Sequence, residues 1–183
     1  MTASKLALFG GKPLRSRPFT AWPIFGQPEE KRLLCTLHSG KWGKLNGPEV
    51  AEFENRFATM HGCKHGIGVV NGTVSLRIAL MAAGIRAEDE VIVPTYTFFS
   101  TASAVVEANA VPVFVDIDLD TFNLDPQAVA AAITPRTRAI IPVHFAGQPA
   151  DMRAIMALAR KHKLVVIEDA AHAHGASYRN QPA

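Results

Sequence analysis

Three short stretches carry residue types that could bind a small molecule, and each follows an apolar run directly. They are the polar turn at 71–75, the aromatic and hydroxyl-rich stretch at 94–101, and the acidic and histidine-rich stretch at 168–175. The carboxyl ends of parallel strands meet at one edge of a sheet, and ligands collect at that edge. The three stretches are therefore candidates for parts of a single site.

The first stretch indicates a place where an anion could bind. Thr73 is well placed to begin a helix with free backbone N–H groups, which attract phosphate through unpaired donors and the helix dipole. Gly72 would let the anion approach the main chain closely. A simple helix cap explains the same residues. A dinucleotide fingerprint does not, because Gly66 and Gly68 stand before or within the apolar run rather than after it.

The second stretch offers aromatic rings among hydroxyl groups. Tyr96, Phe98 and Phe99 are interleaved with threonine and serine where the next helix is expected to open. A flat ring at such a place could stack on a planar ligand, which is worth about 0.5–1.5 kcal/mol beyond burial. The alternative is that these rings belong to the core, where aromatic side chains commonly lie.

The third stretch places a carboxylate, Asp169, at the end of an apolar run. Such a group is costly to bury unless a positive group or a strong donor faces it. A protonated pyridine nitrogen would serve as that partner, and the pairing would keep the ring an effective electron sink. His172, three residues further on, could donate to a ring oxygen or brace Asp169.

Two other interpretations of this stretch stay open. Imidazole and carboxylate groups are common metal ligands, so Glu168, Asp169, His172 and His174 could bind a metal. Their spacing matches no known metal pattern, and adjacent strand residues point to opposite faces, so we expect no metal site. In the other interpretation the two histidines are purely structural.

The elements expected to position these residues alternate between strand and helix, which predicts an α/β fold with a three-layer α/β/α arrangement and a mostly parallel sheet. A segment at 1–27, rich in proline and glycine, is expected to form an extended arm. The remainder, 28–183, is expected to form one domain or most of one. Expected strands lie at 66–70, 91–94, 111–116, 139–143 and 164–169, and expected helices at 28–39, 49–61, 73–84, 98–109, 125–133 and 149–162.

Composition narrows the classes of partner. The chain has 183 residues, 48% of them apolar, and a formal charge of +3 from scattered basic residues, so nucleic acid is not an expected partner. Cys35 and Cys63 show neither disulfide nor zinc spacing, which favours a reducing, cytoplasmic setting. The longest apolar stretch, 98–115, is interrupted by polar residues and proline, so no membrane span or signal peptide is expected.

Several motifs, taken in order, resemble the DegT/DnrJ/EryC1/StrS aminotransferases, and the resemblance covers nearly the whole chain. In the first part of the chain, LFGGKP, a following Trp-Pro, SGKW and FENRFA are similar to members that aminate keto-sugars or scyllo-inosose-type cyclitols. The other matching segments are NGTVSL at 71–76, VIVPTYTFFSTASAV at 91–105, PVFVDID at 112–118, PVHFAGQPADM at 142–152 and VIEDAAHAHGA at 167–177.

The resemblance implies the large domain of a fold-type-I enzyme that uses pyridoxal 5'-phosphate (PLP) and works as a homodimer. Gly72 and Thr73 would then bind the cofactor phosphate, Phe98 would stack on the pyridine ring, and Asp169 would pair with its nitrogen. His172 would lie near the ring's 3-oxygen. His144, in the matching PVHFAG segment, either approaches the substrate or has a structural role.

The resemblance also implies a Schiff-base lysine shortly after Asp169, and the sequence ends at Ala183 without it. We therefore expect the 183-residue chain alone to be an inactive fragment with no catalytic residue of its own. For the full-length enzyme we expect amino transfer from glutamine or glutamate to a keto-sugar or cyclitol. A PLP-dependent sugar dehydratase on the same fold and a non-catalytic product are the alternatives.

Overall fold

A computed structural model of the chain describes residues 5–183 and forms two compact units, Met1–Glu49 and Val50–Ala183. We describe each unit by itself. Within residues 5–183, no helix is both long enough and apolar enough to cross a membrane. The predicted division into an arm at 1–27 and an incomplete domain at 28–183 stays a prediction.

The first unit contains a short 3-10 helix, η1 (Ala7–Phe9), and one α-helix, α1 (Gln27–Ser39), which confirms the helix predicted at 28–39. The Glu29 carboxylate accepts a 2.7 Å hydrogen bond from the Gly26 N–H just before the first turn. This bond satisfies a donor that the helix itself leaves unpaired. The helix ends at Ser39, and the capping residue Gly40 has a φ of +65°, which suits glycine.

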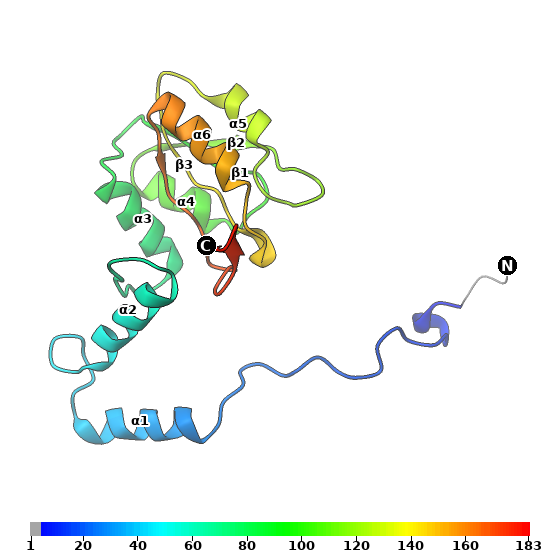
Figure 1. The fold of residues 1–183 in the computed structure, drawn as a ribbon, viewed down its shortest axis with the longest axis vertical. Helices are drawn as coiled ribbons and strands as arrows, with labels where there is room; N and C mark the ends of the chain where they lie inside the picture. The colour runs from blue at the N-terminus through cyan, green and yellow to red at the C-terminus, as the bar shows by residue number, and fades with distance from the viewer. Residues whose placement is uncertain (1–4) are drawn as a thin grey trace. The chain divides into compact units, whose positions relative to one another are not determined.

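The second unit is built on a four-stranded parallel sheet with the order β2-β1-β3-β4 (Figure 1). The strands are β1 (Glu90–Pro94), β2 (Val111–Val115), β3 (Thr137–Ile140) and β4 (Val165–Val166). Every strand pair in this sheet is parallel, which confirms the predicted α/β class. β4 is shorter than the predicted strand at 164–169, but a parallel bridge between Val143 and Asp169 continues the pairing towards the carboxyl edge.

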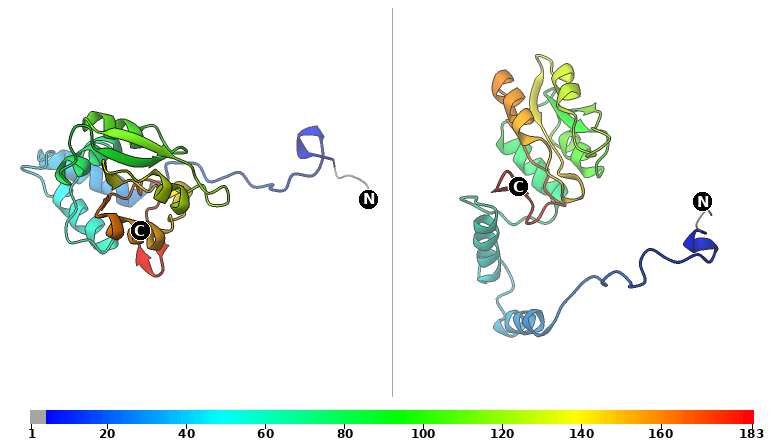
Figure 2. Two further views of the ribbon diagram at one scale, coloured as in Figure 1. Left: turned by 90° about the horizontal axis from the view of Figure 1, so that it is seen from above. Right: turned by 45° about the vertical axis from the view of Figure 1, so that its right-hand side comes forward.

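Helices cover both faces of this sheet, and Figure 2 shows them in two further views. One apolar cluster joins α3 (Gly72–Ala82) and α4 (Ser100–Glu107) to one face. The other cluster joins α5 (Pro126–Ala132) and α6 (Met152–His162) to the opposite face. α2 (Glu49–Met60) confirms the helix predicted at 49–61, and the rings of Phe53 and Phe57 on it are in contact at 5.5 Å.

The inner strand β1 explains why the sheet needs helices on both sides. Val91 and Val93 belong to the cluster with α3 and α4, whereas Ile92 belongs to the cluster with α5 and α6. Successive strand residues point to opposite faces, so a wholly apolar run must be covered twice. All three side chains are fully buried, and burying each contributes about 1.5–3 kcal/mol.

Side-chain caps fix where three of these helices begin. Asn71 caps α3 by accepting a hydrogen bond from Val74 N–H, so the helix starts at Gly72, one residue before the predicted start at Thr73. Asp125 caps α5 and Asp151 caps α6 in the same manner. Asparagine and aspartate are favoured at this position because their oxygens pair with the open N–H groups.

The strand predicted at 66–70 is wrong, because these residues form no ladder with any other part of residues 5–183. Their backbone is satisfied differently: the Gly68 N–H donates 2.7 Å to Glu54 on α2. A Cβ at Gly66 would lie 2.5 Å from the Glu54 carbonyl oxygen. The glycine at this position therefore permits a close approach of two backbones rather than a nucleotide.

A two-stranded antiparallel hairpin, β5 (Ser177–Tyr178) and β6 (Gln181–Pro182), follows the main sheet and was not predicted. Its Tyr178 hydroxyl donates 2.7 Å to the capping carboxylate of Asp151 on α6. This hydrogen bond is the largest influence that lowers the pKa of Asp151. The hairpin is thereby attached to the start of α6.

Candidate functional site

A cleft opens at the carboxyl ends of the strands, where a parallel sheet is expected to bind ligands. It brings together four of the five predicted binding residues: Gly72, Phe98, Asp169 and His172. Thr73 does not line it, although Thr73 is the next residue after Gly72 in α3. The other lining residues are Leu76, Thr97, Ser100, Val143, Phe145 and Ala171.

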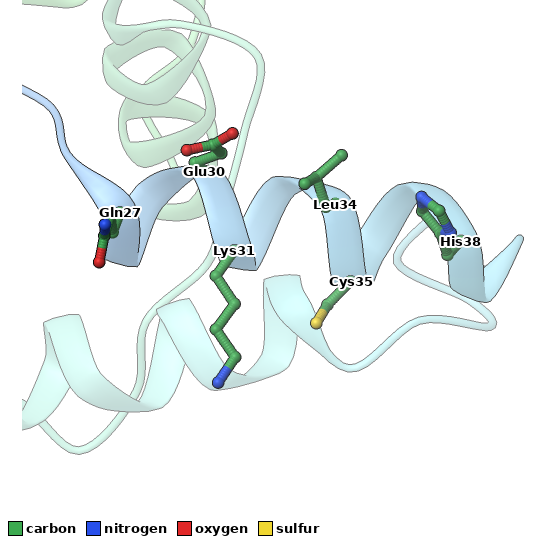
Figure 3. Close-up of a pocket in the computed structure, with 6 residues that line it drawn as sticks. All are labelled: Gln27, Glu30, Lys31, Leu34, Cys35 and His38. Atoms are coloured by element: carbon green, nitrogen blue, oxygen red, sulfur yellow. The ribbon is translucent and has the colours of Figure 1, made fainter.

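A second hollow runs along α1 in the first unit, and Figure 3 shows the six residues that line it. All six, Gln27 to His38, belong to this single helix. A binding site normally needs polar groups that converge from several elements. The cleft of the second unit meets this requirement and the hollow along α1 does not.

The start of α3 supplies backbone donors to the cleft. Asn71 occupies the Val74 N–H, and Ser75 N–H donates to the Asn71 carbonyl. The preceding N–H groups of Gly72 and Thr73 have no acceptor among the described residues. A Cβ added at Gly72 would meet nothing within 4 Å. The fold therefore does not itself require glycine here, whereas an anion drawn to the open N–H groups would benefit from one.

Asp169 is held from both its backbone and its side chain. Its N–H donates 2.9 Å to the Pro142 carbonyl, and its carbonyl accepts from His144 N–H at 3.1 Å. Its Oδ2 accepts a 2.9 Å hydrogen bond from the Thr101 hydroxyl, and its Oδ1 accepts from Ala171 N–H at 3.3 Å. Each carboxylate oxygen can accept more than one hydrogen bond, so capacity remains for a ligand.

Aromatic side chains flank the cleft. Phe98 is 65% exposed, so its ring is not a core ring in this chain, and its exposed area is available to a planar ligand. Phe145 contacts Tyr96 with a centroid distance of 4.7 Å and meets His172 edge-on at 6.0 Å. These contacts support the His172 ring from one side.

His144 is fully buried and lies outside the cleft lining. Its Nδ1 accepts from the Ala150 N–H at 3.1 Å, so its Nε2 carries the proton and donates 2.8 Å to Glu168. This geometry supports a structural role for His144 rather than an approach to the substrate. The carboxylates of Glu168 and Asp169 have different partners, His144 and Thr101, although β4 ends before both residues.

Sequence reasoning missed three hydroxyl residues of the site, Thr97, Ser100 and Thr101. Thr97 and Thr101 stand four residues apart where α4 opens, and their hydroxyl oxygens lie 2.8 Å apart. The i, i+4 spacing of two threonines in the stretch 94–101 was the available signal. Phe145 was also missed, although it directly follows the strand-end residue His144.

Neither a lysine nor a metal cluster accompanies these residues in the described part of the chain. No lysine is among the cleft-lining residues. Across residues 5–183, no three histidine, cysteine, aspartate or glutamate side chains are grouped so that they could hold a metal ion.

Comparison with known proteins identifies the class of this fold. The chain superposes on the crystal structure of 3-amino-5-hydroxybenzoic acid (AHBA) synthase with a TM-score of 0.89 and 44% identity, covering 91% of this chain and 43% of that one. It also matches NtdA from Bacillus subtilis with bound pyridoxamine phosphate (PMP), with a TM-score of 0.78 and 35% identity, covering 88% of this chain and 39% of that one. The fold is thus that of a fold-type-I PLP-dependent transferase.

The family follows from the sequence. The family model for the DegT/DnrJ/EryC1/StrS aminotransferases matches residues 25–183, and the chain belongs to this PLP-dependent family. A relative from Streptoalloteichus tenebrarius, named for L-glutamine:3-amino-2,3-dideoxy-scyllo-inosose aminotransferase activity, is 51% identical over 180 residues. That match covers 97% of this chain and 43% of the relative, so the chain spans less than half of the relative's length.

Proposed function

We propose that the cleft at the carboxyl edge of the sheet binds the PLP or PMP cofactor. The observation that carries this proposal is that Gly72, Phe98, Asp169 and His172, from three separate stretches of the sequence, line one cleft. The residues fit the parts of the cofactor. The open N–H groups of Gly72 and Thr73 suit a phosphate, and the exposed Phe98 ring suits a flat heterocycle.

The Asp169 carboxylate fits the ring nitrogen. It is half-buried, already oriented by two donors, and has acceptor capacity left. When bound, the cofactor supplies an electron sink for the carbon that gains or loses the amino group. Asp169 would hold a proton on the ring nitrogen, His172 would contact a polar group of the ring, and the start of α3 would bind the phosphate. These roles orient the ring and fix its charge.

For the whole protein we propose amino transfer to a keto-sugar or a keto-cyclitol of the scyllo-inosose type, with glutamine or glutamate as the donor. The name of the Streptoalloteichus relative supports both the cyclitol and the glutamine. Homodimerisation and a cytoplasmic location belong to the same proposal. The unpaired, exposed Cys35 and Cys63 support a reducing compartment.

The test is a titration of the 183-residue chain with PMP, because PMP binding needs no covalent bond to a lysine. Isothermal calorimetry would measure it, with inorganic phosphate and pyridoxamine as partial ligands. We expect saturable 1:1 binding of PMP that is tighter than binding of either part. A folded chain that binds PMP no better than inorganic phosphate would contradict the cofactor site. Size-exclusion chromatography with light scattering, with and without PMP, addresses the dimer.

A further inference from the structure

A chain of hydroxyl groups lies behind Asp169. The Thr101 hydroxyl donates 2.9 Å to Asp169 Oδ2, and the Thr97 and Thr101 hydroxyl oxygens are 2.8 Å apart. Thr101 is fully buried, whereas Thr97 lines the cleft. This series of hydrogen bonds therefore runs from Thr97 at the cleft surface through the buried Thr101 to the Asp169 carboxylate.

The chemistry of the three groups determines which one donates in each of these hydrogen bonds. An ionised carboxylate can only accept, so Thr101 must donate its single proton to Asp169. Thr101 then has only lone pairs left for Thr97, and Thr97 must donate to Thr101. Hydrogen bonds to a charged group are the stronger ones, and consecutive bonds polarise one another.

We propose that Thr101 is the positioning residue for Asp169, and that Thr97 fixes the orientation of the Thr101 hydroxyl. This inference rests on the proposed function, because it assigns both threonines to the contact between Asp169 and the ring nitrogen of PLP or PMP. Thr101 holds Oδ2 from the α4 side while the Ala171 N–H holds Oδ1. The carboxylate is thus locked before a ligand arrives, which lowers the entropy lost on binding.

The test compares two ligands on the 183-residue chain: PMP and its 1-deaza analogue, in which C–H replaces the ring nitrogen. For Thr101→Val, which keeps the shape and removes the hydroxyl, we expect PMP binding about tenfold weaker. The same substitution should change the affinity for the deaza analogue less than twofold, because that ring makes no bond to Asp169. Thr101→Ser keeps the donor and should restore PMP binding to within about twofold. Thr97→Val should give a smaller loss, again for PMP only.

Thr137→Val is the matched control. Thr137 is also a buried threonine whose hydroxyl contacts a carboxylate, Glu90, but both stand at the opposite, amino edge of the sheet. This variant should lower stability without changing the ratio of the two affinities. Circular dichroism confirms the fold of each variant, and Thr101→Cys replaces Thr101→Val should the latter fail to fold.

Two results would overturn the inference. Either PMP binds Thr101→Val as tightly as the unchanged chain, or the substitution weakens PMP and the deaza analogue equally, which is what a merely structural role predicts. If the unchanged chain binds neither ligand, the proposed function fails as well, so the two failures are distinguishable.

Discussion

Glu168 and Asp169 are consecutive in the sequence, yet their carboxylates bond to different parts of the molecule. Glu168 accepts a 2.8 Å hydrogen bond from the buried His144 and lies outside the cleft lining, whereas Asp169 accepts from Thr101 and lines it. The pair therefore offers an internal comparison between two carboxylates that are adjacent in the sequence but differ in whether they line the cleft.

Asp169→Asn should weaken PMP binding by about tenfold or more, because the amide cannot hold a proton on the ring nitrogen through a charge. Glu168→Gln should leave the affinity within about twofold, since its amide oxygen still accepts from His144. Calorimetric titration of both variants measures the difference. Equal losses of PMP affinity in the two variants would show that the negative charge near this position matters, rather than the Asp169 carboxylate itself.

Gly72→Ala should separate stability from binding. Alanine is the better helix former, and the added Cβ meets nothing within 4 Å, so the unfolding free energy should stay unchanged or rise by about 0.5 kcal/mol. The same Cβ stands beside the open N–H groups and should weaken PMP binding. Pyridoxamine, which lacks the phosphate, should be affected far less. Urea denaturation and ligand titration give the two quantities, and an unchanged PMP affinity would argue against phosphate at this helix start.

Gly66→Ala should behave in the opposite manner. Its Cβ would lie 2.5 Å from the Glu54 carbonyl oxygen, which is too close for any real contact. Either α2 or the 66–70 segment must shift, and overpacking of this kind costs about 1–3 kcal/mol. Urea denaturation measures the loss, with Gly72→Ala as the glycine control in open space. A stability equal to that of the unchanged chain would mean that the two backbones are not held this closely.

Glu90 should make stability depend on pH. Hydrogen bonds from Thr134 and then Arg136 outweigh the effect of burial and lower the pKa of this carboxyl below its ordinary value of 4.5. The folded pKa is below the unfolded one, so the stabilisation is fully present above about pH 4.5 and is lost as pH falls through the folded pKa.

Glu90→Gln tests that dependence. Urea midpoints measured from pH 7 down to pH 3 should fall less steeply in this variant than in the unchanged chain, because the linked proton is gone. The variant should also be less stable at pH 7, where Arg136 loses its 2.5 Å ion pair. Parallel curves for the two proteins would show that another carboxyl carries the acid sensitivity.

The parallel sheet and its helices could be predicted from the sequence because the apolar runs at 91–94 and 139–143 have strand length and are separated by helical patterns. The run at 66–70 is also apolar, but it contains two glycines and no strand forms there. Composition reports what could be buried in a sheet, whereas a strand also needs a neighbour to complete its hydrogen bonds.

Part of the candidate site could be predicted from residue types that directly follow an apolar run. Asp169 is such a carboxylate, and Gly72 follows the apolar run 66–70 even though no strand forms there. Thr101 was not predictable in this sense, because its contact with Asp169 joins residues 68 positions apart through packing. The hairpin at Ser177–Pro182 was missed because its strands are only two residues long, too short to show alternation.

In the order β2-β1-β3-β4, Asp169 follows β4, which is the outer strand on one side of the sheet. Phe98 and Thr101 follow β1, which is an inner strand. A cofactor that spans these groups would pin that edge to the middle of the sheet. Ligand binding and edge opening are then competing equilibria, so PMP should slow hydrogen exchange at the Asp169 amide more than at amides of β1. Loss of edge order would empty the cleft well before the core unfolds.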